Sequence, residues 1–337
     1  MTAPLVSVVV PMYNDSRTIG LCLESIYAQD YQPLEVIVVD DASTDDCPAL
    51  ASKYPCKLVS AVSNGGPGAT RNLGVQHASG EVIFFIDADM TMYPDAITNA
   101  VRLFQSGVGY GAVFGVPDKV PLFTETLVGQ YRILQYHYWR KSAEGLVSGG
   151  FYALGAVLRS AFDDAGWFNP SLRQTEEIDH AERLSRRHPM LLTSQISGQL
   201  SDESHLWPIV RKAFVRSRLR VPFYLDRGRA MQGMETGGRA FAAVLAALTI
   251  ASLPAIALSW WAGLGTLALL AAFVAVDLGQ YVFVKRERGW AFLAFFTLIH
   301  LVMNTAAVTG LAAGMAQWVV SGRFRTLYRR GLSASQA

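Results

Sequence analysis

Two aspartates, Asp87 and Asp89, stand directly after a short apolar run at residues 82–86. Residues two apart on an extended chain project to the same side, so both carboxylates face one place. Mg²⁺ and Mn²⁺ prefer oxygen ligands of this kind and keep open positions for phosphate oxygens. The pair therefore predicts a divalent cation site that could bridge the protein and a diphosphate group.

Short elements of regular structure must position these acids. Apolar runs predict strands at residues 6–11, 34–39, 58–61 and 82–86. Helical spacing predicts helices at residues 18–28, 68–77 and 177–187. Near-continuous apolar strands that alternate with helices indicate an α/β fold, with a mostly parallel sheet covered on both faces. Ligands of such sheets bind beyond the carboxyl ends of the strands, so the acidic loops there should converge on one cleft.

Four motifs in sequence order carry a resemblance to a known family. They read VSVVVPMYN at 6–14, VIVVDDASTD at 36–45, NGGPGATRN at 64–72 and DAD at 87–89. Over residues 5–190 this order resembles family 2 glycosyltransferases with the GT-A fold, a Rossmann-like arrangement. The resemblance implies an inverting transfer from a nucleotide-activated sugar, most commonly a UDP-sugar, with Mg²⁺ or Mn²⁺ as cofactor.

The resemblance also implies roles on the donor side. The residues that would border the nucleoside are Pro11, Tyr13 and Asp15, and the base would meet Asp40 or Asp41. Arg71 would shape the donor pocket, Asp87 would reach the ribose as well as the metal, and Asp89 would be the principal metal ligand. His205 could add a nitrogen ligand. The chain departs from the family at Ala42, where Gly is usual, and at Asp15, where Glu is usual.

An acceptor-side segment is the second part of the resemblance. Residues 166–169 (GWFN) are followed by the acids Glu176, Glu177 and Asp179 and then by Arg183. This order is similar to the family segment that holds the catalytic base. Glu177 stands where that base would be, and Asp179 is the second candidate. A base must reach the acceptor hydroxyl opposite the diphosphate. The alternative is that these are ordinary helix-start acids favoured by the helix dipole, and a phosphate acceptor would need no strong base.

The C-terminal third has a different composition. Apolar segments at 241–259, 262–284 and 291–320 have lengths near the roughly 20 residues that cross a bilayer. The first two predict a hairpin that turns at Trp260 and Trp261. A single crossing by the third segment would place the basic tail on the outer side of the membrane. A segment that is bent near Asn304 and Thr305 would avoid this. Residues 206–231 form a basic amphipathic stretch suited to an anionic membrane surface.

These features predict four parts: a GT-A domain at 1–205, a basic juxtamembrane segment at 206–239, transmembrane helices at 240–322 and a basic tail at 323–337. We expect a multi-pass protein of the cell membrane with its catalytic domain in the cytoplasm. Three cysteines without metal-ligand spacing agree with a reducing compartment.

The expected partners are a nucleotide-sugar and a lipid or lipid-linked acceptor, and nucleic acid is not expected. Two alternatives are a polyprenyl-phosphate glycosyltransferase and an inactive scaffold of the same fold. A dinucleotide oxidoreductase is disfavoured, because no glycine fingerprint follows the first strand.

Overall fold

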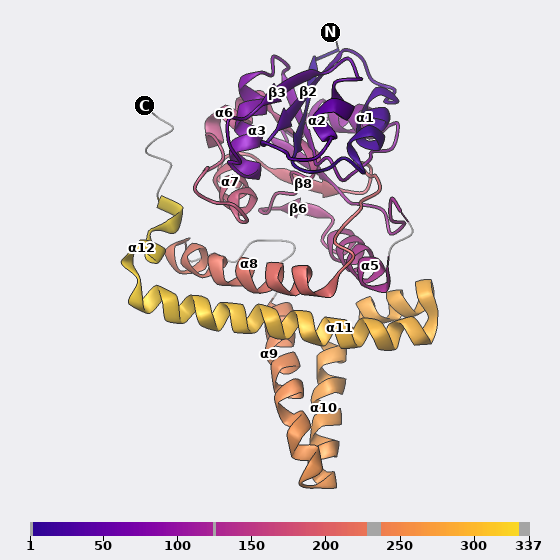
Figure 1. Cartoon of the computed structure of the whole chain (residues 1–337), viewed down its shortest axis with the longest axis vertical. Helices are drawn as coiled ribbons and strands as arrows, with labels where there is room; N and C mark the ends of the chain where they lie inside the picture. The colour runs from indigo at the N-terminus through magenta and orange to yellow at the C-terminus, as the bar shows by residue number, and fades with distance from the viewer. Residues whose placement is uncertain (1–2, 124–125, 228–236, 330–337) are drawn as a thin grey trace.

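The computed structural model describes residues 3–123, 126–227 and 237–329 of the 337-residue chain. It has three tiers (Figure 1). An α/β body contains the N-terminal residues, two long helices lie beneath it, and a pair of helices projects from them on the side away from the body.

The body is built on one eight-stranded mixed sheet of order β3-β2-β1-β4-β7-β5-β8-β6. The strands are β1 Val6–Met12, β2 Leu34–Asp40, β3 Lys57–Ser60, β4 Val82–Ile86, β5 Ala112–Gly115, β6 Gly145–Val147, β7 Leu154–Leu158 and β8 Met190–Thr193. β1 to β4 are mutually parallel, whereas β7 is antiparallel to both β4 and β5. The four predicted strands are confirmed to within a residue or two.

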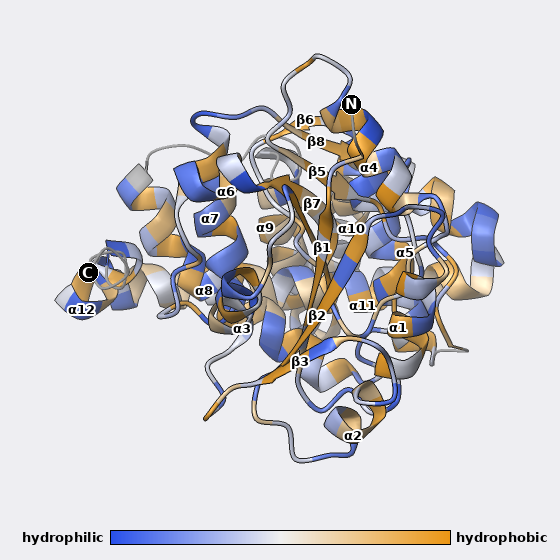
Figure 2. Ribbon diagram, turned by 90° about the horizontal axis from the view of Figure 1, so that it is seen from above, coloured by the Kyte–Doolittle hydropathy of each residue, from blue (hydrophilic) through white to orange (hydrophobic). Residues whose placement is uncertain are grey.

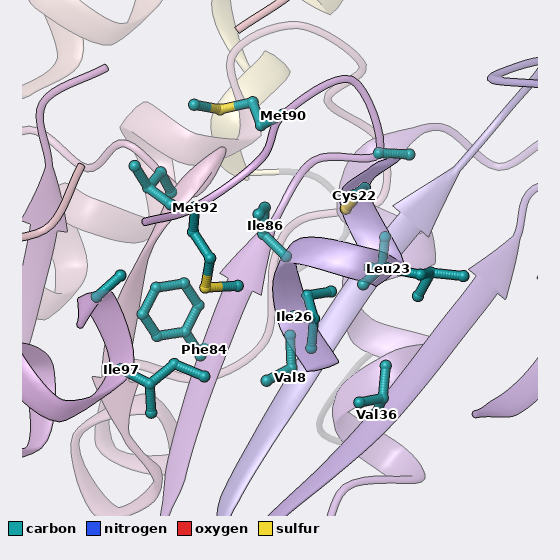
Figure 3. Close-up of a cluster of buried hydrophobic side chains, with 14 of the residues drawn as sticks. Val8, Cys22, Leu23, Ile26, Val36, Phe84, Ile86, Met90, Met92 and Ile97 are labelled. Carbon is teal, nitrogen blue, oxygen red and sulfur yellow. The ribbon is translucent and has the colours of Figure 1, made fainter. Parts of the chain in front are cut away.

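Helices cover both faces of the sheet, as the apolar strands predict. They are α1 Ile19–Tyr27, α2 Cys47–Ala51, α3 Pro67–Gln76, α4 Ala96–Phe104, α5 Leu127–Lys141, α6 Arg159–Ala165 and α7 Glu176–Ser185. Neighbouring strand residues point to opposite faces. Phe84 therefore packs with Ile26 of α1 and Ile97 of α4 (Figure 3), while Phe85 packs with Phe162 of α6. Seen from above, the central strands are predominantly hydrophobic (Figure 2).

The C-terminal helices form the two lower tiers. They are α8 Leu206–Arg227, α9 Gly237–Ser252, α10 Trp260–Val276, α11 Leu278–Val320 and α12 Gly322–Arg325, with 3-10 turns η1 Leu253–Ala257 and η2 Leu327–Arg329. α9 and α10 form an antiparallel hairpin, and α8 and α11 lie side by side across its base (Figure 1). A Cβ on Gly310 would lie only 2.3 Å from the Phe214 carbonyl oxygen, so the missing side chain allows α8 and α11 to approach closely.

Two expectations for this region are wrong. The apolar segment at 262–284 is not one helix, because the chain turns at Asp277 between α10 and α11. The Tyr138 hydroxyl of α5 donates to Asp277 at 3.1 Å, and this contact ties the corner to the body. The chain is helical through Asn304 and Thr305, and the break in α11 lies instead at Gly289, where φ is 80°.

Two described segments, Gly237–Ala257 and Leu278–Val320, are long and apolar enough to cross a membrane by length and composition. The predicted turn of the hairpin is close to the observed one, since α10 begins at Trp260. Arg229 of the basic stretch and Arg330 of the tail lie outside the described residues.

Candidate active site

Arg71 is the centre of the candidate site. It lies on α3, after the glycine-rich turn, and its side chain is 2% exposed. One terminal nitrogen, Nη2, lies 2.9 Å from Asp87 Oδ1 and 2.8 Å from Glu177 Oε1. The other, Nη1, lies 3.3 Å from Glu176 Oε1. The predicted donor-side acid and the predicted base are therefore brought together by one guanidinium.

The charges around Arg71 do not balance, because one guanidinium faces three carboxyl groups. Burial, with the charge of Glu177, raises the pKa of Glu176 to about 7 in spite of the contact with Arg71. Burial also raises the pKa of Glu177, against the opposing effect of Arg71. Desolvation thus outweighs Arg71 together with the weaker effects of Arg216 and Arg140, and the cluster tends to hold a proton.

More acids surround Asp89. Burial is the largest cause that raises the pKa of Asp89 well above its usual range, and the charges of Asp87, Asp15 and Asp202 add to it. Burial also raises the pKa of Asp15 to about 6, although its carboxylate accepts a 2.9 Å hydrogen bond from the Tyr13 amide. Carboxylates crowded in this way suit a hard divalent cation, which would relieve their mutual repulsion.

The ligand set is smaller than the one predicted. Among the described residues, no group of three or more His, Cys, Asp and Glu side chains is arranged to hold a metal ion. His205 is exposed at the start of α8, where its Nδ1 lies 3.1 Å from Ser204 Oγ. Asp87 and Asp89 are the two predicted ligands that remain, and their carboxylates are oxygen donors of the kind that Mg²⁺ or Mn²⁺ prefers.

The two acids at the end of β2 accept hydrogen bonds from backbone amides. Asp41 accepts hydrogen bonds from the amides of Gly65 and Gly66, at 2.8 and 2.9 Å, one on each carboxylate oxygen. Asp40 accepts one from the Ser43 amide at 3.0 Å. Asp41 therefore fixes the glycine-rich turn before α3. The contact of Asp40 or Asp41 with the base stays a prediction.

The residues that were predicted to border the nucleoside lie at the end of β1 and just beyond it. Pro11 is buried within that strand, and Tyr13, just beyond it, is 46% exposed. Ala42 has a φ of 60°, in the left-handed region that glycine adopts most easily. This conformation explains why a glycine is usual at that position in the resembling family.

Asp179 has a structural contact, and its role as an alternative base stays a prediction. Its side chain is fully buried and pairs with Arg183 Nη2 at 3.1 Å. Arg183 in turn donates to the Gly166 and Trp167 carbonyls, at 3.2 and 2.8 Å. The pair therefore braces the turn before α7. Glu177, with 29% of its side chain exposed, is the better-placed acid.

Asp202 and Glu176 were not predicted as parts of the site. Asp202 reaches Asp89 because residues 197–201 pair with the segment after β4, through Thr91 N to Gln199 O and Ser201 N to Asp89 O. No local sequence signal marks that pairing. Glu176 stands next to the predicted base, and only the position of Arg71 reveals its contact.

The mixed sheet is Rossmann-like, with two acids at the end of its fourth strand and the helix after the glycine-rich turn beside them. This arrangement is a GT-A-like fold. Residues 7–163 match the model of glycosyl transferase family 2. Residues 7–163, slightly less than half of the chain, therefore have the features of a family 2 glycosyltransferase domain.

Similar proteins agree with this assignment. The chain is 40% identical over 102 residues to the succinoglycan biosynthesis protein ExoO of Rhizobium meliloti, covering 29% of each protein. It is 39% identical over 107 residues to the putative glycosyltransferase EpsH of Bacillus subtilis, covering 30% of this chain and 31% of EpsH. It thus matches less than a third of the length of either relative.

Longer matches cover most of the chain. The uncharacterized protein MT1568 of Mycobacterium tuberculosis is 27% identical over 248 residues, which is 68% of this chain and 75% of MT1568. Among solved structures, the mannosyltransferase PcManGT from Pyrobaculum calidifontis, in complex with GDP-Man and Mn²⁺, has a TM-score of 0.57 and 21% identity. That match covers 95% of this chain and 88% of PcManGT, and it shows the shared fold.

Proposed function

We propose that this protein transfers a sugar, with inversion, from a nucleotide-sugar to a membrane-associated acceptor, in a reaction that requires Mg²⁺ or Mn²⁺. The observation that carries the proposal is the position of Arg71, which contacts Asp87 on the donor side and Glu177 on the acceptor side. An inverting displacement needs a base within reach of the acceptor. Both acids contact one guanidinium nitrogen, so the donor-side acid and the candidate base lie next to each other, as a single transfer site requires.

Asp89 and Asp87 would hold the divalent cation. A bound cation would neutralise charge on the departing diphosphate. The crowded carboxylates around Asp89 support this role, and PcManGT, which shares the fold, was solved with Mn²⁺ and a nucleotide-sugar. We expect a UDP-sugar as donor, with Tyr13 and Asp40 beside the nucleoside.

Glu177 would remove the proton from the acceptor. Its Oε1 atom is held by Arg71 at 2.8 Å, which fixes the orientation of the carboxylate while its raised pKa favours accepting a proton. Glu176 is less suited, because its side chain is only 6% exposed.

The predicted division into four parts, at 1–205, 206–239, 240–322 and 323–337, belongs to the same proposal. The α9–α10 hairpin would enter the membrane, and its stacked, exposed Trp260 and Trp261 would lie at an interface. α8 and α11 cross the base of the hairpin and would lie along the cytoplasmic surface, below the catalytic body.

The test is a transfer assay on the full chain in detergent, with a panel of nucleotide-sugars, a membrane lipid extract and Mn²⁺. We expect Asp89→Asn to lower transfer by at least about 100-fold, since the cation supplies several kcal/mol of charge stabilisation. The matched control is Asp163→Asn, which removes one exposed carboxylate. Full activity of Asp89→Asn would remove the metal from the mechanism. Absence of nucleotide-sugar binding with Mn²⁺ present would favour an inactive scaffold.

A further inference from the structure

One face of helix α3 is turned towards the segment that carries Glu177. Gly68, Arg71 and Asn72 belong to this face, because helix residues three and four positions apart lie on the same side. Arg71 contacts Glu177 from it, at 2.8 Å. Gly68 and Asn72 contact the same segment at two further points, so α3 touches it both before and at the start of α7.

Asn72 holds the backbone of this segment. Its Nδ2 atom donates to the Phe168 carbonyl at 2.8 Å, and its Oδ1 atom accepts from the Phe168 amide at 2.9 Å. An asparagine can do this because its short side chain carries both a donor and an acceptor. The Phe168 ring is fully buried and stacks on the His180 ring of α7, with 4.3 Å between the centroids. The anchor at Asn72 therefore reaches the helix that begins with Glu176 and Glu177.

Gly68 allows α3 and α7 to approach closely. A Cβ atom at this position would lie 3.2 Å from both the Cβ and the Cγ of Glu176, and 3.5 Å from the Cβ of Phe168. The contact with Glu176 would be tighter than ordinary van der Waals contact, so a methyl group there would force a shift of a few tenths of an ångström. Since one of the two atoms is the Cβ of Glu176, the start of α7 would have to move.

An outer contact joins the same two parts of the chain. Arg173 donates from Nη1 to Asn64 Oδ1 at 3.0 Å and from Nη2 to the Asn64 carbonyl at 2.7 Å. Asn64 begins the glycine-rich turn before α3. Arg173 is exposed, whereas Asn72 is half-buried, so we expect the inner contact to fix the segment more firmly.

We propose that Asn72 and Gly68 are positioning residues that hold Glu177 at the place beside the donor site that transfer requires. This inference rests on the proposed function, in which Glu177 removes the proton from the acceptor. Asn72 acts through Phe168, and Gly68 acts through Glu176. A misplacement of about 1 Å at a reacting group can cost about 100-fold in rate, so small shifts of this segment are sufficient to slow transfer.

The experiment compares Asn72→Ala and Gly68→Ala with the wild type, as full chains in detergent. One variant removes both hydrogen bonds to Phe168, and the other pushes on Glu176. We expect kcat for transfer to fall about 10- to 100-fold in each. The KM of the donor, and the affinity for UDP with Mn²⁺ in a calorimetric titration, should change less than about threefold. Alanine is a better helix former than glycine, so α3 should persist in Gly68→Ala.

The matched control is Gln76→Ala, at an exposed position on the same helix, which should behave as the wild type does. A merely structural role would lower the melting temperature and leave the kcat of the folded enzyme unchanged. Unchanged kcat in both variants would therefore overturn the proposal. Loss of UDP affinity in step with kcat would overturn it too, because these residues would then serve the donor site.

Hydrogen exchange tests the anchor separately from the reaction. The amides of residues 167–178 should exchange faster in Asn72→Ala than in the wild type, and the largest change should occur at Phe168, whose amide loses its acceptor. Unchanged exchange at these residues would overturn the anchor even where transfer is observed. A wild type that binds no nucleotide-sugar would contradict the proposed function instead, and exchange at Phe168 would still decide whether Asn72 holds the segment.

Discussion

Replacing Glu176 by glutamine should make the stability of the protein less dependent on pH. Its pKa rises from an ordinary 4.5 to about 7, because burial and the neighbouring Glu177 outweigh Arg71. A carboxyl group with a raised pKa in the fold stabilises the fold while it is protonated. That contribution is complete below pH 4.5 and is lost as the pH rises through about 7.

The magnitude follows from the two pKa values. The difference between 4.5 and about 7 corresponds to about 3 kcal/mol, at about 1.4 kcal/mol per pH unit. Glu177 contacts the same guanidinium and shares the proton, so about 3 kcal/mol is the ceiling for Glu176 alone. In a domain of this size the effect corresponds to a difference in melting temperature on the order of 6–12 °C.

The assay is the melting temperature of the full chain in detergent, from about pH 5 to pH 8, with a chelator present. The wild type should lose stability across this range, and Glu176→Gln should lose clearly less. Glu81→Gln, which removes one exposed carboxylate, should follow the wild type. An identical pH slope in the wild type and in Glu176→Gln would refute the idea that the buried cluster holds a proton.

Three further substitutions test the geometry. Arg71→Lys replaces a guanidinium group that contacts three carboxyl groups by a single ammonium group. We therefore expect kcat to fall about 10- to 150-fold in a transfer assay. Asp179→Asn leaves the buried Arg183 charge without its partner and should destabilise the protein by about 3–5 kcal/mol, measured by thermal melting. Gly310→Val places a side chain against the Phe214 carbonyl and should cost about 1–3 kcal/mol or more, measured in the same way.

These substitutions have controls within the chain. Gly265 has open space around the position of a Cβ, so Gly265→Val should be tolerated far better than Gly310→Val. Lys53→Arg, at an exposed position on the body, should leave kcat unchanged. A stable Asp179→Asn variant that had lost only transfer activity would contradict the structural role and favour Asp179 as the base.

The sequence alone determined the local features of this protein. The apolar runs gave the parallel strands, since a strand covered on both faces must be apolar at every position, as Phe84 and Phe85 show by packing on opposite sides. Strand ends are local too, so the acids at Asp87 and Asp89 were predicted at the correct edge of the sheet. The antiparallel insertion of β7 was not predicted, because pairing order depends on segments far apart in the chain.

The tertiary structure alone decided which acids share a charge partner and where the C-terminal helices go. Arg71 and Glu177 are 106 positions apart in the chain, so no spacing rule could pair them. Asp179, two residues from Glu177, is buried against Arg183 because helical geometry turns it to the other side. The direction of α11 was set by contacts of Asp277 with the body and by close approach at Gly310. A hydropathy profile reports the length and composition of each apolar segment, and it carries no information about such contacts.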